Sequence, residues 1–281
     1  MLDELFILTK ALHEAGRSIE AIRKTNLTVI HKTNHDPLTE ADLAANNILQ
    51  NQLLSHFPHD GWLSEENKDD TKRLHHQRVW IIDPIDGTKE FIQHLPEYVI
   101  SVALVENHIP VLAAVYHPVH DQLFYAIKGH GTWLRERSAD DTSLKEKRVT
   151  CDDSSSSTLT ILASRTEVRD GKWEAIKKIH HVKEVGSIAY KLALIASGQA
   201  QATISFAPKH EWDIAAGVLL VTEAGGTVTD LSGRPFLFNQ AELLVNGVIA
   251  AGQQNHEKIL KTSPLLPRFL WEERVRERRD F

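Results

Sequence analysis

Residues 80 to 91, which read WIIDPIDGTKEF, place Asp83 and Asp86 directly after a hydrophobic run. Pro84 keeps Asp83 extended, and Gly87 can adopt backbone angles that are closed to other residues. A turn explains the proline and the glycine, but it does not require two carboxylates three positions apart. The stretch therefore raises the question of what these two aspartates hold.

Two interpretations of this stretch stay open. The loop can offer Asp83, Asp86 and the carbonyl of Ile85 to a hard cation such as Mg²⁺, which takes oxygen ligands. Thr88 would then open a helix or turn whose free N–H groups can receive an anion. The alternative is an Asx-turn in which both aspartates bond to the local backbone.

The composition is that of an ordinary globular protein. The 281 residues suffice for one large domain or two moderate ones, and 42% are hydrophobic and 25% charged. No apolar stretch approaches the length of a membrane span, and no secretory signal is evident. The single cysteine, Cys151, suits a reducing cytoplasm, with peripheral membrane association left open. A net charge of −6 gives no electrostatic basis for binding a nucleic-acid polymer.

Hydrophobic periodicity predicts helices and then hairpins in the first half of the chain. Spacings of three and four from Leu5 to Ile22 predict an amphipathic helix, and Thr39 can cap a second helix that continues to Leu53. The predicted strands are residues 78–82, 99–105, 111–118 and 122–127. Their close spacing favours antiparallel hairpins, because parallel pairs need long crossovers.

A polar stretch at 135–158 predicts a boundary between two halves. Beyond it, predicted strands alternate with predicted helices; the strands are 159–164, 182–185 and 200–205, and the helices are 172–179, 187–197 and 212–224. We therefore expect an α+β half over 1–150 and an α/β half over 151–262. A charged tail over 263–281 is expected to dock as a helix or to fray.

Three further acidic motifs each have an ordinary explanation when taken singly. Glu65 and Glu66 follow a predicted loop and can be a solvated turn. Asp213 begins an apolar helix, where an acid is common because of the helix dipole. Thr39 and Asp42 have the spacing of a capping box.

Taken together and in this order, these motifs resemble the inositol monophosphatase superfamily of metal-dependent, lithium-sensitive phosphatases. The resemblance covers roughly residues 5 to 252. The matching segments are DPLTEAD at 36–42, the Glu65–Glu66 pair, DPIDGT at 83–88, and WDIAA at 212–216 followed by EAGG at 223–226. Such a likeness implies the layered α/β/α/β/α sandwich of this superfamily.

The resemblance also implies a metal site with two or more Mg²⁺ ions. The position of Glu65 binds the first metal in this family, and that of Asp83 bridges two metals. The carbonyl of Ile85 is a further ligand. Asp86 and Asp213 match the positions that hold the second metal. Inhibition by lithium is expected on the same grounds.

The catalytic residues implied by the resemblance are Asp42, Thr88 and Glu65. Asp42 and Thr88 match a pair that orients the attacking water, and Gly87 and Thr88 match the positions that cradle the phosphate. The substrate-binding set implied in this way is Ile85, Asp86, Gly87, Thr88, Ser187, Lys191 and Asp213. Lys191 can equally be a solvated residue on an amphipathic helix.

Within the superfamily, DGTKEFI at 86–92 and the segment around Lys191 look most like the CysQ branch, the 3'(2'),5'-bisphosphate nucleotidases. The segment GSIAYK at 186–191 keeps the lysine, but its serine spacing is one residue longer than in that branch. The expected reaction is hydrolysis of adenosine 3',5'-bisphosphate to AMP by a monomer or homodimer. Inositol monophosphate and fructose 1,6-bisphosphate are the alternative substrates, and a catalytically silent binding protein is the alternative class.

Overall fold

The larger of two main sheets contains seven strands in the computed structural model, which describes residues 1–25, 29–31, 37–137 and 143–261. In spatial order they are β3 (Gly61–Ser64), β4 (Arg78–Asp86), β5 (Val99–Glu106), β6 (Ile109–His117), β7 (Gln122–Ile127), β8 (Thr132–Arg137) and β9 (Leu144–Val149). Every neighbouring pair is antiparallel except β3 and β4, which are parallel. The predicted hairpins are confirmed.

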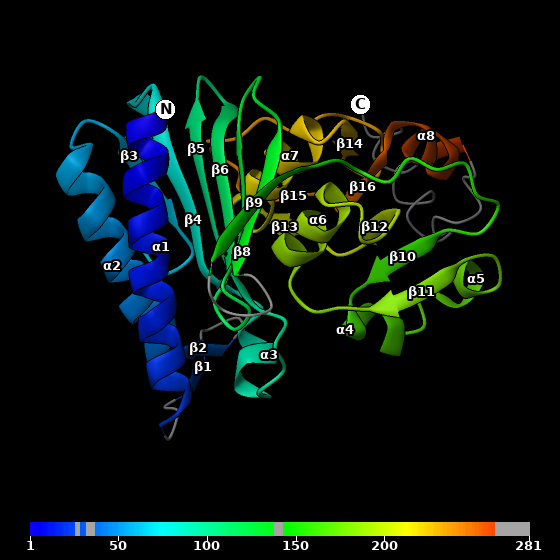
Figure 1. Cartoon of the computed structure of the whole chain (residues 1–281), viewed down its shortest axis with the longest axis horizontal. Coiled ribbons are helices and arrows are strands. Elements are labelled where there is room, and N and C mark those ends of the chain that lie inside the picture. The colour runs from blue at the N-terminus through cyan, green and yellow to red at the C-terminus, as the bar shows by residue number, and fades with distance from the viewer. Residues whose placement is uncertain (26–28, 32–36, 138–142, 262–281) are drawn as a thin grey trace, which may run out of the picture.

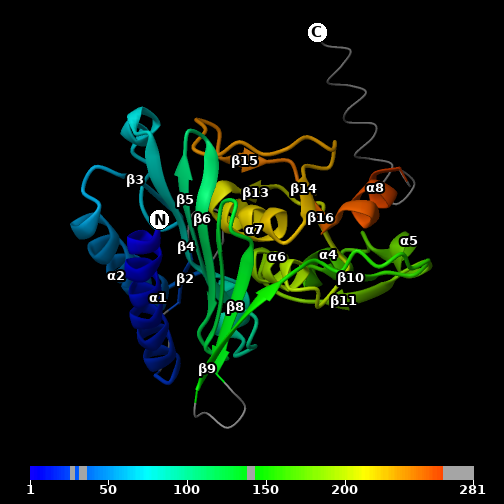
Figure 2. The same cartoon turned by 45° about the horizontal axis from the view of Figure 1, so that its top comes forward.

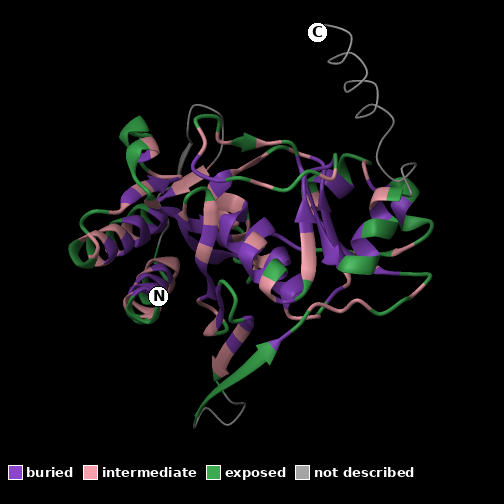
Figure 3. Cartoon of the chain, turned by 90° about the horizontal axis from the view of Figure 1, so that it is seen from above, coloured by how far each residue is buried: buried purple, intermediate pink, exposed green. Residues whose placement is uncertain are grey.

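Both faces of this sheet are covered, which explains why its strands are nearly continuous hydrophobic runs. Side chains alternate between the two faces of a strand. Trp80 and Ile82 pack into a cluster with the helices of one side, whereas Val79 and Ile81 pack into a cluster on the other side. Figure 3 shows buried residues along the strands in the middle of the molecule.

Two helices form the outer layer on the first face of the sheet (Figure 1). They are α1 (Leu2–Arg23) and α2 (Glu40–His56). The predicted apolar stripe of α1 is fully buried at Leu8, Leu12 and Ile19. The predicted cap of α2 is also confirmed, because the Thr39 side chain accepts a hydrogen bond from the backbone N–H of Ala41 at 3.2 Å.

Two more helices, α6 (Ile188–Ala196) and α7 (Glu211–Glu223), lie between the larger sheet and a five-stranded one (Figures 1 and 2). The second sheet has the order β11 (His181–Glu184), β10 (Thr160–Ala163), β12 (Ala202–Ser205), β16 (Val248–Gly252) and β14 (Gly226–Thr229). Because both helices are sandwiched, they are apolar on nearly every side. The strand β16, late in the chain, lies inside this sheet between β12 and β14.

The far face of the second sheet carries α4 (Arg165–Arg169), α5 (Glu174–Lys177) and α8 (Gln253–Lys261). The result is the predicted α/β/α/β/α order of layers (Figure 1). Shorter elements connect the layers: β1 (Val29–His31) with β2 (Pro37–Thr39), η1 (Thr71–His75), α3 (Thr88–Ile92), and β13 (Lys209–His210) with β15 (Leu244–Val245).

The structure corrects two sequence-based expectations. The segment before Glu65 was predicted as a loop but is the strand β3. The helix predicted over 172–179 is one short turn, α5. The polar stretch 135–158, where a boundary is expected, contains the end of β8 and all of β9, an edge strand with mostly exposed side chains.

The structure does not test two further expectations. The division near residue 150 stays a prediction, and the tail 263–281 lies outside the described residues. None of the helices within the described ranges is both long and apolar enough to cross a bilayer.

Candidate active site

A β-bulge at the end of β4 brings Asp83 and Asp86 to one side of the strand. Asp83 pairs with Ser101 and Asp86 pairs with Val99, so β4 has one residue more than β5 between the two pairs. Residues three apart in a regular strand point to opposite faces, and the extra residue corrects that mismatch. The Asx-turn is present as well, because the backbone N–H of Ile85 donates to Oδ1 of Asp83 at 3.0 Å.

Gly87 and Thr88 turn the chain sharply after the bulge. Gly87 has φ +104°, and a Cβ on it would lie 2.7 Å from the carbonyl oxygen of Glu97. Only glycine therefore fits this position. Thr88 begins α3 as predicted, and its hydroxyl lies 3.0 Å from the carbonyl oxygen of Ile85.

Asp42 reaches Thr88 across 46 residues of sequence. Oδ1 of Asp42 accepts a hydrogen bond from the Thr88 hydroxyl at 3.2 Å, and Oδ2 accepts from the backbone N–H and the hydroxyl of Thr39 at 2.7 and 2.6 Å. The contacts of Asp42 with Thr39 and with Thr88 are therefore both present, and its catalytic role stays a prediction. One oxygen closes the capping box and the other holds the Thr88 hydroxyl.

The parallel pairing of β3 and β4 places Glu65 beside Asp83. Ser64 pairs with Ile82, and the backbone N–H of Glu65 continues the ladder by donating to the carbonyl of Ile82 at 3.2 Å. The next residue on each strand is an acid. The missed strand β3 is thus the element that brings Glu65 to the aspartates.

The N-terminus of α7 brings Asp213 to the same place from the second half of the chain. The Ser101 hydroxyl donates to the carbonyl of Trp212 at 3.3 Å, and Ser101 is the strand partner of Asp83. Oδ2 of Asp213 accepts from the backbone N–H of His210 at 2.8 Å. A helix N-terminus carries partial positive charge, which offsets part of the negative charge gathered here.

The N-terminus of α6 points at Asp86. Oδ2 of Asp86 accepts hydrogen bonds from the Ser187 hydroxyl at 2.6 Å and from the backbone N–H of Ala189 at 2.5 Å. The Ser187 hydroxyl also accepts from the backbone N–H of Tyr190 at 2.9 Å, so it caps the helix. Ser187 holds this position with φ 54°, an uncommon value for a residue with a side chain.

Lys191 is buried beneath the same helix end. It is 3% exposed, and its ammonium donates to the carbonyl of Val185 at 3.1 Å. Burial, and then the positive charge of Lys209, lowers the pKa of Lys191 to about 8. The interpretation of Lys191 as a solvated helix residue is therefore wrong, because its side chain packs inside the protein.

Burial and the neighbouring carboxylates raise the pKa values of Asp83 and Asp213. Burial raises the pKa of Asp83 well above its usual range, and the negative charges of Glu65, Asp86, Asp213 and Asp42 raise it further. Burial and the charge of Asp86 raise the pKa of Asp213 to about 8. These acids are therefore near enough to affect one another electrostatically, and their role as a common metal site stays a prediction.

The chemistry of the donor set fits a divalent cation. The hydrogen bonds of Asp83, Asp86 and Asp213 to other described residues engage one oxygen of each carboxylate and leave the second oxygen for another ligand. As they stand, no three His, Cys, Asp or Glu side chains in the described ranges are clustered tightly enough to hold one ion. Asp86 and Asp213 each direct one oxygen to a backbone N–H at the start of a helix.

Sequence reasoning missed Ser101 and Asn46. Ser101 sits in an apolar strand and gave no signal. Asn46 is one helical turn after Asp42 on α2, a spacing that could have indicated it. Oδ1 of Asn46 accepts from the Ser64 hydroxyl at 2.7 Å, and its amide donates to Asn67 at 3.0 Å, so Asn46 holds both sides of the Glu65 turn.

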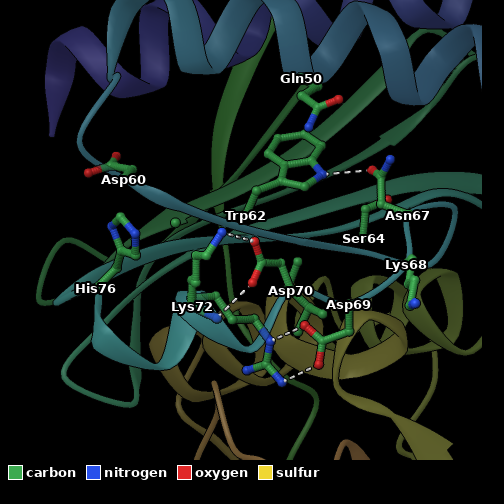
Figure 4. A pocket seen from close by; sticks show the side chains of 13 residues that line it. Gln50, Asp60, Trp62, Ser64, Asn67, Lys68, Asp69, Asp70, Lys72 and His76 are labelled. Carbon is green, nitrogen blue, oxygen red and sulfur yellow. Dashed lines mark hydrogen bonds and ion pairs between the residues drawn. The ribbon is translucent and has the colours of Figure 1, made fainter.

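A cavity of about 370 Å³ adjoins this turn, and Figure 4 shows Trp62, Ser64 and Asn67 at its wall. Trp62 donates to Asn67 at 2.9 Å. None of Glu65, Asp83, Asp86 and Asp213 lines the cavity, so it is separate from the carboxylate site.

Comparison with known proteins agrees with this geometry. The model of the inositol monophosphatase family matches residues 2–266. The 3'(2'),5'-bisphosphate nucleotidase CysQ of Escherichia coli (strain K12) is 31% identical over 247 residues, which are 88% of this chain and 97% of that relative. The inositol-1-monophosphatase of Bacillus subtilis (strain 168) is 31% identical over 257 residues, 90% of this chain and 93% of that relative.

A solved structure extends the likeness to the fold. The crystal structure of CysQ from Bacteroides thetaiotaomicron superposes with a TM-score of 0.73 at 30% identity, over 88% of this chain and 96% of that chain. The chain therefore belongs to the inositol monophosphatase family and, like these relatives, is a phosphatase.

Proposed function

We propose that this phosphatase is Mg²⁺-dependent and removes the 3'-phosphate of adenosine 3',5'-bisphosphate. The observation that supports metal dependence is the nearness of four acids: Glu65, Asp83, Asp86 and Asp213. Four carboxylates would repel a phosphate group unless cations lay between them and the phosphate. With Mg²⁺ at these residues and at the Ile85 carbonyl, the site would polarise the phosphoryl group and lower the pKa of water.

The protein's own contribution begins with the Asp42–Thr88 pair. When the Thr88 hydroxyl donates to Asp42, its lone pair faces away from that carboxylate and can accept a hydrogen from the attacking water. The water oxygen would then bond to phosphorus as the bond from phosphorus to the 3'-oxygen breaks, and one proton of that water would end on the 3'-oxygen, which gives AMP and inorganic phosphate. Gly87 leaves room for the phosphate beside the backbone of α3.

A bisphosphate substrate is supported by positive charge close to the carboxylates. Lys191 and Lys209 act on each other electrostatically, and Lys209 lowers the pKa of Asp213 against the raising effect of the acids. With metal ions neutralising the phosphate under attack, Lys209 would fit a second phosphate, whereas Lys191 adds positive charge from inside the protein. The Ser187 hydroxyl, which is committed to Asp86, supports that acid and not the substrate.

Inositol monophosphate is the second candidate substrate. The same 31% identity to CysQ of Escherichia coli and to the inositol-1-monophosphatase of Bacillus subtilis favours neither enzyme. Fructose 1,6-bisphosphate completes the set to be tested. A reducing cytoplasmic setting remains the expectation from the single cysteine, and a monomer or homodimer remains the expected assembly.

Phosphate release measured side by side on the three substrates tests the proposal. We expect kcat/KM to be highest for adenosine 3',5'-bisphosphate, and Lys209→Met to lower that value more than the value for inositol 1-phosphate. A higher kcat/KM for inositol 1-phosphate would move the protein to the inositol branch. Full activity in excess EDTA would exclude the metal dependence.

A further inference from the structure

Arg73 is a buried cation in the segment that joins β3 to β4, the same segment that carries Glu65. The residue is 2% exposed. Its Nε and Nη2 atoms donate to the two carboxylate oxygens of Asp69 at 2.7 and 3.0 Å. Asp69 lines the cavity shown in Figure 4. This two-pronged contact fixes the orientation of the guanidinium plane.

The other edge of the guanidinium reaches across to the second half of the chain. Nη1 donates to Oδ1 of Asn239 at 2.6 Å, and Nη2 donates to the carbonyl of Gln240 at 2.8 Å. The Asn239 amide returns a hydrogen bond to the carbonyl of Arg73 at 3.3 Å. Asn239 has φ 57° and is 4% exposed, so the fold holds it in a costly conformation to make these contacts.

Glu211 continues the network into α7. Its carboxylate, 1% exposed, accepts from the backbone N–H groups of Asn239 at 2.6 Å and Gln240 at 2.8 Å. Glu211 is the first residue of α7, two positions before Asp213. An unbroken series of hydrogen bonds therefore runs from the Glu65 segment to the helix that carries Asp213.

We propose that Arg73, Asn239 and Glu211 are positioning residues that set how closely Glu65 and Asp213 approach each other. This inference rests on the proposed metal dependence. The two acids come from different halves of the chain, and the hydrogen-bond series joins the segments that carry them. Replacing a largely buried ion pair by well-packed apolar groups is often neutral for stability, so we assign to this network the fixing of geometry. Arginine suits that task, because its planar fork sets direction as well as charge.

Calorimetric titration of the full chain with Mg²⁺ tests the network, with thermal melts in EDTA and steady-state kinetics beside it. Arg73→Lys keeps the charge and loses the fork. Asn239→Gly tolerates the backbone angle and loses the side-chain contacts while leaving the Arg73–Asp69 pair. Arg234→Lys is the matched control, since Arg234 is 73% exposed and pairs with Asp230 at 2.8 Å on the surface.

We expect Arg73→Lys and Asn239→Gly to raise the Mg²⁺ dissociation constant by about 10–100-fold, as loss of residues that orient metal ligands does. Catalytic turnover should recover at saturating Mg²⁺, and Arg234→Lys should bind Mg²⁺ like the wild type. Lower melting temperatures with an unchanged Mg²⁺ dissociation constant would overturn the inference and leave the network as scaffold. If Arg73→Lys does not fold, Asn239→Gly decides. A wild-type protein that binds no Mg²⁺ would instead refute the metal dependence itself.

Discussion

Replacing Asp42 with asparagine separates the two tasks of this side chain. The oxygen of the new amide can stay with Thr39, where Oδ2 of Asp42 now accepts two hydrogen bonds, so the cap of α2 survives. The amide N–H₂ must then face the Thr88 hydroxyl, which now donates to Oδ1 at 3.2 Å. An N–H₂ group cannot accept that hydrogen bond. The hydroxyl would turn to the carbonyl of Ile85, 3.0 Å away, and its lone pair would be taken by the amide.

The sizes of the two effects differ enough to be told apart. Positioned acid–base groups contribute about 10²–10⁴-fold to a rate, so we expect kcat to fall at least roughly a hundredfold. Losing a helix cap costs about 1 kcal/mol. That loss would lower the melting temperature of a chain of this size by about 2–4 °C. Asp42→Asn should leave the melting temperature close to the wild-type value, because burial already raises the pKa of Asp42 and the neutral amide removes its repulsion with Glu65.

The assay is phosphate release under saturating substrate and Mg²⁺, together with thermal melts. Thr39→Ala is the matched variant, because it removes the hydroxyl that accepts from Ala41 and leaves the contact between Asp42 and Thr88. It should melt earlier and keep most of its turnover. An Asp42→Asn protein that melts earlier and turns over normally would show that Asp42 is only a cap.

Three other perturbations test the site. Asp83→Asn should abolish Mg²⁺-dependent phosphate release and yet raise the melting temperature in EDTA. The reason is that it removes a buried carboxylate whose pKa is raised by burial and by the charge of Glu65. A lower melting temperature would contradict the claim that repulsion among these carboxylates destabilises the metal-free protein. Gly87→Ala should cost about 1–3 kcal/mol in chemical denaturation, because alanine disfavours φ +104° and its Cβ would meet the Glu97 carbonyl at 2.7 Å; wild-type stability would contradict this. In EDTA, the folded state holds a proton on Asp213 up to about pH 8, whereas the unfolded state releases it near the ordinary value of 3.8. Metal-free stability should therefore fall as pH rises through that window, and the melting-temperature gain on adding Mg²⁺ should be larger at about pH 8.5 than at about pH 6; an equal gain would refute the assignment.

Much of the fold could be predicted from local patterns in the sequence. The spacing of apolar residues predicted α1, and the runs at 99–105 and 111–118 predicted two strands of antiparallel hairpins. Thr39 and Asp42 predicted a real capping box, because a cap depends on residues three apart and little else.

Contacts between distant segments set the rest of the site, and no single segment reveals them. The strand β3 has four residues, and its pairing with β4, not its composition, makes it a strand. Lys191 looks like an exposed helix residue until α6 is placed between two sheets. The hydrogen bond from the Ser187 hydroxyl to Asp86 joins residues 101 positions apart, so the sequence alone does not show it. Arg73 and Asn239 are 166 residues apart in the sequence, so no pattern within either segment predicts their contact.

The place of β16 inside the second sheet has a consequence for how the enzyme is made. A ribosome releases β10 and β12 first, but these strands gain their connection to β14 only when Val248–Gly252 has emerged. At 5–20 residues per second, the interval between the end of β10 at Ala163 and the end of β16 at Gly252 is on the order of ten seconds. During that time the nascent chain already displays Glu65, Asp83 and Asp86, while the sheet beneath α6 and α7 is still open. We therefore expect the nascent chain to become active only after β16 has paired with β12 and β14, which is later than the synthesis of the acids.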